Sequence, residues 1–159
     1  MNKNEYPDNQ EGRLILGIPV IDKQHEDLFR ILNKLHLLCS KTVESGNYTL
    51  MQAAYEAIDY IKYHFRTEEK LMGLLGFPGF SHHKREHDNF LIELLNHYNQ
   101  LKEDNNLAPN SFVSLLREWA FPHFEVYDKV FADFLLNMKH HAKIKQIFAK
   151  ESLLISDPA

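Results

Sequence analysis

Four long stretches of the sequence carry apolar residues three and four positions apart, the spacing that places side chains on one face of an α-helix. The breaks between these stretches are short and rich in glycine, proline or asparagine: SGN at 45–47, GFPGF at 76–80 and NNLAPN at 105–110. The predicted helices run from about Asp22 to Glu44, Leu50 to Leu75, Ser81 to Asp104 and Ser111 to Lys139. No segment shows the alternation of a strand, and short connections favour antiparallel neighbours. The sequence therefore predicts an all-α, antiparallel up-down-up-down four-helix bundle.

The apolar stripes place a single core inside this bundle. They are Ile21, Leu28, Leu32, Leu35 and Cys39 in the first helix; Ala54, Ile58, Ile61, Phe65 and Met72 in the second; Phe90, Leu94 and Leu101 in the third; and Phe112, Leu116, Trp119, Val130 and Phe134 in the fourth. With 159 residues, 44% of them hydrophobic, the chain is long enough for one well-buried domain. We expect that domain to span 1–139, including an irregular N-terminal arm at 1–21.

Residues 140–159 form a C-terminal extension that begins with basic residues. Its segment AKIKQIFAKESLL has the pattern of a short amphipathic helix. Packing on the bundle, self-association and contact with a protein partner are three roles that this pattern leaves open, and simple packing is the favoured one.

Composition excludes several classes of protein. The net charge is −4 and no basic block precedes the C-terminal extension, which argues against a nucleic-acid partner. No apolar run approaches the roughly 18 residues of a membrane span. The polar start, MNKNEYPDNQEG, lacks the apolar region of a secretory signal. Cys39 is the only cysteine, so no internal disulfide forms, and we expect a cytoplasmic location.

Polar residues interrupt all four apolar stripes at one expected depth. In an antiparallel bundle, the start of the first and third helices, the end of the second and the lower half of the fourth share one end. The interruptions are His25 in the first helix, His64 and Glu68 in the second, His83 and His87 in the third, and His123 and Asp128 in the fourth. Burying a carboxylate is costly unless something pairs with it, and metal cations would offset that cost.

The residue types predict a site for two metals. Five histidines and two carboxylates exceed what a tetrahedral zinc site uses. If both carboxylates and a solvent-derived oxygen bridge two metals, dividing the histidines three and two leaves one metal with an open position. Imidazole together with carboxylate suits iron. The segment HKREH at 83–87 is not the zinc-protease motif, because Lys84 stands where that motif has glutamate.

The other histidines are predicted not to bind the metals. His82 lies five residues before His87 and faces elsewhere on the helix. His36, His97, His140 and His141 have no acidic partner at the right depth.

Pro122, directly before His123, predicts a kink in the fourth helix. His123 and Asp128 are five residues apart, or about 140° around a regular helix. A widened, π-like turn would bring them closer to one face. The alternative is that the kink only bends the helix around the core, and the sequence does not decide between the two.

The combined spacing of these residues resembles the hemerythrin family. The matching segments are GIPVIDKQHEDLFRILNKL, HFRTEEKLM, FPGFSHHKREHDNF and REWAFPHFEVYDKVF, within roughly residues 12–139. The resemblance implies two iron ions with a bridging oxo or hydroxo group, held by His83, His87 and His123 on one side and His25 and His64 on the other. It further implies that Glu68 and Asp128 bridge the two irons and that dioxygen binds at the iron of His25 and His64.

The resemblance also implies an apolar oxygen pocket, with Leu28, Phe65, Trp119 and Phe124 in its wall. Ala120 and Phe124 stand where the family usually has leucine and isoleucine. The implied function is not enzymatic: it is reversible binding of dioxygen for storage, delivery or sensing. Two rivals remain, a di-iron enzyme such as a peroxidase or a reductase of nitric oxide or peroxide, and an oxygen or redox sensor that acts through a partner.

Overall fold

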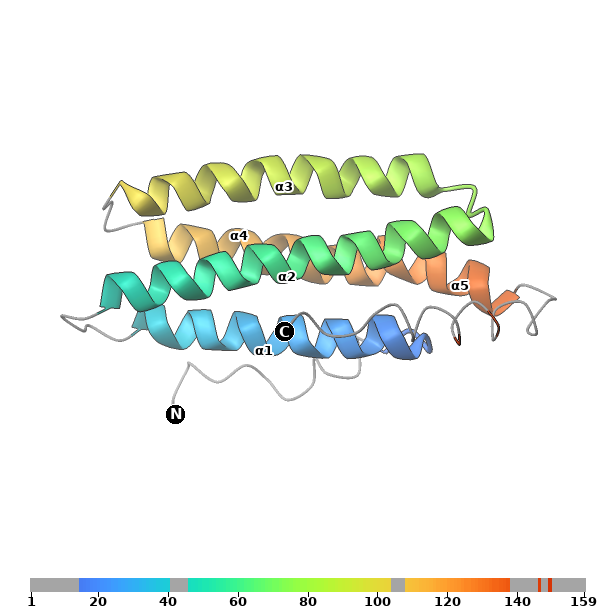
Figure 1. Ribbon diagram of the computed structural model, residues 1–159, viewed down its shortest axis with the longest axis horizontal. Helices are drawn as coiled ribbons and strands as arrows, with labels where there is room; N and C mark the ends of the chain where they lie inside the picture. The colour runs from blue at the N-terminus through green and yellow to red at the C-terminus, as the bar shows by residue number, and fades with distance from the viewer. Residues whose placement is uncertain (1–14, 41–45, 104–107, 138–145, 147–148, 150–159) are drawn as a thin grey trace.

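Four long helical rods make up the molecule (Figure 1). The structure is a computed structural model that describes residues 15–40, 46–103, 108–137, 146 and 149. The first three rods are α1 (Pro19–Ser40), α2 (Gly46–Leu75) and α3 (Phe80–Lys102). The fourth is divided into α4 (Ala108–His123), a π-helical turn η2 (Phe124–Asp128) and α5 (Lys129–Asn137). Successive rods run in opposite directions, which confirms the predicted antiparallel four-helix bundle.

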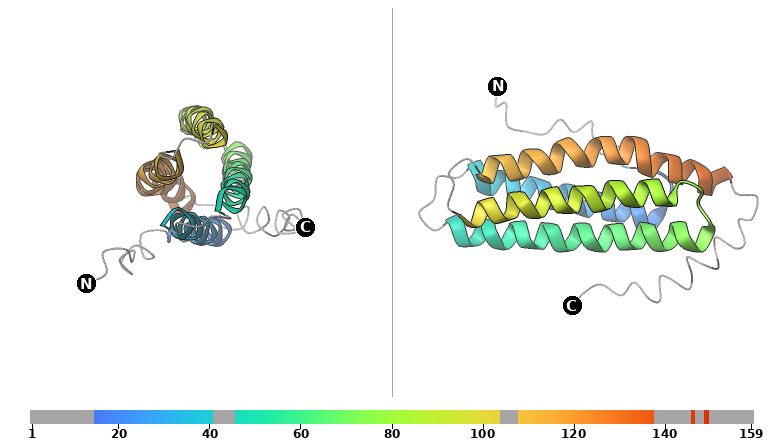
Figure 2. Two further views of the ribbon diagram at one scale, coloured as in Figure 1. Left: turned by 90° about the vertical axis from the view of Figure 1, so that its left-hand side faces the viewer. Right: turned by 90° about the horizontal axis from the view of Figure 1, so that it is seen from above.

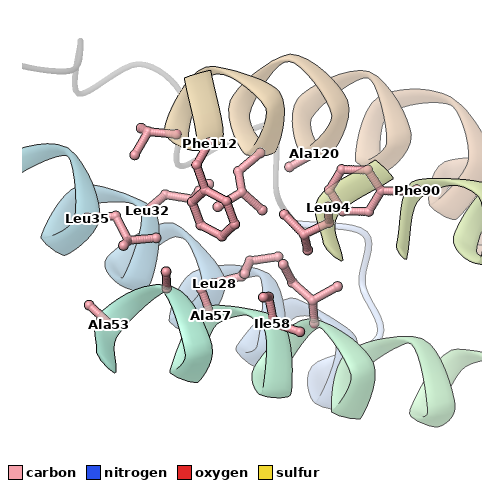
Figure 3. Packing of buried hydrophobic residues seen from close by; sticks show 14 of the residues in the cluster. Leu28, Leu32, Leu35, Ala53, Ala57, Ile58, Phe90, Leu94, Phe112 and Ala120 are labelled. Atoms are coloured by element: carbon pink, nitrogen blue, oxygen red, sulfur yellow. The ribbon is translucent and has the colours of Figure 1, made fainter. Parts of the chain in front are cut away.

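Each rod packs against two others, so the bundle closes around one interior. α1 contacts α2 and α4, and α3 contacts the same two helices from the other side. The end-on view in Figure 2 shows this ring of rods. The buried hydrophobic residues form two clusters. Figure 3 shows part of the larger one, where Leu32, Phe112 and Leu94 of three different rods meet.

The start of α1 differs from the prediction, and its predicted end near Glu44 lies outside the described residues. The helix begins at Pro19, three residues before Asp22, because proline fits the first turn of a helix, where no intrahelical N–H bond is lost. Asp22 lies inside the first turn, and its carboxylate accepts hydrogen bonds from the N–H groups of Leu16 (2.6 Å) and Gly17 (3.1 Å). It therefore ties down the segment that enters the helix. α1 is described as far as Ser40, and 41–45 lie outside the described residues.

The break predicted at 76–80 is present and tight. α2 begins at Gly46, earlier than predicted, and ends at Leu75. Gly76 follows with φ +66°, the left-handed conformation that commonly ends a helix, and the Phe77 N–H donates to the Met72 carbonyl (2.9 Å). At Gly79 a Cβ atom would approach the Phe77 ring to 2.7 Å, so any larger residue there would have to displace that ring. α3 then starts at Phe80.

The fourth rod corrects one part of the predicted core. Val130 is 56% exposed, and Phe134 is only half-buried. Phe131, Ala132 and Leu135 are buried in their place. The reason is the π-helical turn, which uses about one more residue per turn than an α-helix and so shifts the buried face by one position.

The predicted C-terminal extension, 140–159, lies outside the described residues except for positions 146 and 149. Among the helices that the structure describes, none is both long enough and apolar enough to span a bilayer.

Candidate metal centre

The seven polar residues predicted from the sequence meet in one buried layer. Each has at most 2% of its surface exposed. The layer separates the larger hydrophobic cluster from the smaller one, which includes Ile21, Met72 and Phe131. All four rods contribute to it: His25 from α1, His64 and Glu68 from α2, His83 and His87 from α3, and His123 and Asp128 from the fourth rod.

Three of the histidines point their Nε2 atoms at one another. The Nε2 atoms of His83, His87 and His123 lie 3.0 or 3.1 Å apart in all three pairs. Three such nitrogens cannot all be joined by hydrogen bonds, because each carries either one proton or one lone pair. Two nitrogens bound at right angles to one ion, each at about 2.1 Å, lie about 3.0 Å apart, whereas the tetrahedral angle separates them by about 3.4 Å. The three atoms therefore have the spacing expected of ligands that share one ion.

The other two histidines face the same pair of carboxylates. His25 Nε2 is 3.1 Å from Asp128 Oδ2, and His64 Nε2 is 3.7 Å from Glu68 Oε2. The carboxylates also reach the three-histidine group. Glu68 Oε2 lies 3.3 Å from His87 Nε2, and Asp128 Oδ1 lies 3.0 Å from His123 Nε2. Potential ligand atoms thus gather in two sets, of three and of two histidines, that share Glu68 and Asp128.

Several buried atoms in this layer have no hydrogen-bond partner among the described residues. They include both carboxylate oxygens of Glu68 and Nε2 of His64. An unpaired buried charge is strongly unfavourable, whereas a cation between these atoms would satisfy them together. The donor set, imidazole nitrogen with carboxylate oxygen, suits a transition-metal cation. The residues present therefore fit a pair of metal ions.

The carboxylates are held in their charged form. Burial raises the pKa of Glu68, as does the charge of Asp128, but His64, His83 and His87 outweigh both and lower it to about 2. Burial likewise opposes ionisation of Asp128, but His123, His25 and His83 hold its pKa well below the usual range. The layer accordingly holds two carboxylate charges inside an apolar bundle, and these charges attract cations.

The histidines divide in their response to this charge. Burial favours their neutral form, but contacts with Asp128 and Glu68 raise the pKa of His83 to about 9. The pKa of His87 is also raised, against the effect of burial, by Glu68 and Glu69. For His64 burial prevails and lowers the pKa to about 4, and it lowers the pKa of His123 as well. Positive charge therefore concentrates on the three-histidine side.

Two histidines are held from behind by residues that the sequence patterns did not single out. His64 Nδ1 lies 3.1 Å from Oε1 of the buried Gln24, and His87 Nδ1 lies 3.1 Å from Oε1 of Glu69. Such contacts fix the orientation of a metal-binding imidazole. Gln24 and Glu69 each directly adjoin a predicted ligand in the sequence, but adjacency on a helix does not imply a shared face.

Three of the four predicted oxygen-pocket residues stack on histidines of the polar layer, each on a different one. Phe124 stacks on His25, with ring centroids 4.0 Å apart. Phe65 stacks on His87 (3.7 Å) and not on its sequence neighbour His64 (5.8 Å). Trp119, half-buried, stacks on His123 (4.1 Å). A small apolar cavity lies one turn from the layer, lined by Leu28, Leu32, Ile61, Phe90, Leu116, Trp119 and Ala120.

The histidines predicted not to bind metal lie away from this layer where the structure describes them. The side chain of His82 is 61% exposed, next to the buried His83. His36 and His97 are half-buried on helix surfaces, and His97 Nδ1 lies 3.1 Å from the Glu93 carbonyl oxygen. His140 and His141 lie outside the described residues.

Comparison with known proteins agrees with this geometry. The model of the hemerythrin HHE cation binding domain matches residues 16–135, which include all seven polar residues. The chain therefore belongs to the hemerythrin family, as its motifs predicted. It is 29% identical to a bacteriohemerythrin of Stenotrophomonas maltophilia over 120 residues, 76% of either chain.

Other relatives carry the same name. The chain is 32% identical over 114 residues to a bacteriohemerythrin of Methylococcus capsulatus, covering 69% of this chain and 82% of the relative. It is 31% identical over 122 residues to one of Aquifex aeolicus, covering 74% and 88%. No solved structure matches the chain.

Proposed function

We propose that the chain binds dioxygen reversibly at a non-haem centre of two iron ions, and that it stores, delivers or senses oxygen. His83, His87 and His123 hold one iron, His25 and His64 hold the other, and Glu68 and Asp128 bridge them. The observation that carries the proposal is the unequal division of five histidines between two sets of ligand atoms that share both carboxylates. Membership of the hemerythrin family supports the choice of cation-dependent chemistry.

The iron pair, when bound, supplies the electrons that hold dioxygen reversibly. The residues determine where it binds. The three-histidine side offers one more imidazole than the two-histidine side, so the free position belongs to the iron at His25 and His64. Glu68 and Asp128 supply two negative charges, and an imidazole that binds a metal ion is neutral and does not offset them. This pair of charges therefore adds to the hold of the five histidines on the cations.

The surroundings of His25 exclude water from that position. Phe124 covers the His25 ring and is 2% exposed, and Leu28, one turn along α1, is equally buried. Neither side chain can donate a proton. Dioxygen bound against this wall would leave as dioxygen, because the wall offers nothing to protonate or displace it. This property favours a carrier over an enzyme that turns oxygen over.

Iron content tests the metal centre. We expect two irons per chain in protein from iron-replete cells, measured by elemental analysis. His83→Ala should lose most of the iron, since it removes one of the three converging Nε2 atoms. The matched control is His82→Ala, one position away, whose side chain is exposed. Equal losses in both variants, or a single zinc and no iron in the parent protein, would contradict the proposal.

A further inference from the structure

Gln24 joins two helices behind His64. It is 3% exposed, and its amide lies between α1 and α2. Its Nε2 donates to the hydroxyl of Thr67 (3.1 Å), while its Oε1 lies 3.1 Å from His64 Nδ1. The nitrogen and the oxygen of the amide therefore contact two residues of α2, Thr67 and His64, that lie about one helical turn apart.

The hydroxyl of Thr67 fixes the donor and the acceptor in each hydrogen bond of the series Thr67–Gln24–His64. The Thr67 hydroxyl donates its only proton to the Tyr63 carbonyl oxygen, 3.0 Å away. It must then accept from Gln24, which turns the NH₂ group of the amide toward Thr67 and the carbonyl oxygen toward His64. Since that oxygen is only an acceptor, His64 must donate from Nδ1. Its Nε2 is left with a lone pair directed at the buried layer.

On the three-histidine side of the centre, the group behind the imidazole is a charged carboxylate instead of a neutral amide. His87 Nδ1 is held by Glu69, a carboxylate that Lys84 also contacts at 3.4 Å. Glu69 is partly exposed, whereas Gln24 is not. A carboxylate at position 24 would add a third buried negative charge beside Glu68 and Asp128, so the neutral amide provides the same acceptor atom without that cost.

We propose that Gln24 is a positioning residue: oriented by Thr67, it keeps the proton of His64 on Nδ1 and the Nε2 lone pair available to the cation at the two-histidine set. This inference rests on the metal centre of the proposed function, but not on the identity of the metal or on dioxygen binding. Its consequence is that two residues outside the ligand set control the affinity of the second cation.

The first measurement is the tautomer of His64 in the metal-free protein, read from the ¹⁵N chemical shifts of its ring. In the parent the proton should be on Nδ1. Gln24→Leu removes the acceptor, and Thr67→Val removes the group that orients the amide, so both should move the ring toward the Nε2-protonated form. Thr67→Ser keeps the hydroxyl and is the matched control, with the tautomer of the parent. No metal is needed, so the result is readable even if the chain fails to bind iron or dioxygen.

The second measurement is titration with Co²⁺ alone, followed by absorbance and calorimetry. We expect Gln24→Leu and Thr67→Val to weaken the second Co²⁺ by about 10- to 100-fold and to leave the first unchanged. Thr67→Ser should bind both ions as the parent does. If Gln24→Leu and Thr67→Val both keep the Nδ1 tautomer and bind both ions with parental affinity, Gln24 only fills space and the inference is wrong. If Gln24→Leu does not fold, the tautomer and the Co²⁺ affinity of Thr67→Val, which preserves the side-chain volume, test the inference alone.

Discussion

The Nε2 atom of His123 lies 3.0 Å from Oδ1 of Asp128, although five residues separate the two along one helical rod. On a regular α-helix such residues point about 140° apart. The π-helical turn at Phe124–Asp128 removes this mismatch, directly after Pro122, which has no N–H to donate to the carbonyl four residues back. The sequence left open whether the proline merely bends the helix, and the structure contains the widened turn.

Deletion of Val126 tests whether the turn accommodates one extra residue. Val126 is 55% exposed within η2, and without it an ordinary α-helix would keep Phe131 and Leu135 in the core. We expect metal-free protein lacking Val126 to melt within a few degrees of the parent. Deleting Ile92, which is 63% exposed in α3, would instead turn the helix after it by about 100° and remove Leu94 from the core.

That control deletion should lower the melting temperature by about 10 °C or more, since each leucine lost from a core costs about 2–5 kcal/mol and each kcal/mol is about 2–4 °C. Circular dichroism at 222 nm in the presence of a chelator follows both variants. If the two deletions lowered the melting temperature by similar amounts, the turn η2 would not be accommodating one extra residue.

The metal-free protein should lose stability on mild acidification because of His64. Its pKa is about 4 in the folded chain against 6.5 in the unfolded one, so the unfolded state takes up a proton first as the pH falls below 6.5. The stabilisation is complete above pH 6.5 and is lost as the pH falls toward 4. Between pH 6.5 and 5 the loss from His64 amounts to about 1.5 kcal/mol.

Urea unfolding at these two pH values measures the effect. His64→Gln removes the titrating group, so this variant should lose about 1.5 kcal/mol less than the parent over the same interval. The same pH dependence in both proteins would mean that His64 is not buried in its neutral form.

Adjacent carboxylates should differ sharply in their effect on iron. Glu68→Ala removes a fully buried charge that faces both histidine sets, so most of the iron should be lost. Glu69→Ala removes only the partly exposed acceptor behind His87. It should retain two irons at saturation, with affinity lowered by up to about 100-fold. Elemental analysis and a chelator competition distinguish the two, and similar iron content in both variants would exclude Glu68 as the bridge.

The wall beside His25 should govern how long the oxygenated protein survives. Leu28→Asn introduces a polar group that attracts water, and Phe124→Ala uncovers the His25 ring. Both variants should keep two irons and autoxidise faster than the parent, measured as decay of the oxygenated absorbance in air-saturated buffer. Phe65→Leu is a useful contrast, because Phe65 stacks on His87 on the other side of the centre, and it should change the decay less. Parental decay in both wall variants would remove the support for dioxygen binding at His25 and His64.

The helical spacing predicted the fold and the meeting of seven polar residues, because i,i+4 pairs such as His64 and Glu68 share a face and antiparallel topology sets their depth. It did not predict that Phe131 replaces Val130 in the core, since that depends on a π-helical turn that the spacing of His123 and Asp128 suggested but did not decide. Gln24 also escaped notice. A single polar residue on a helix has no periodic signal, and its importance comes from Thr67 on another helix.

The most direct test of the account is the uptake of dioxygen by anaerobically reduced, iron-loaded protein, followed with an oxygen electrode and the visible spectrum. We predict one dioxygen taken up per two irons, and its recovery as dioxygen when the solution is purged with argon, with the original spectrum restored. The account would be contradicted if protein with two irons took up no oxygen. It would equally be contradicted if, with excess reductant, oxygen were consumed continuously and none could be recovered, since the centre would then be an enzyme's.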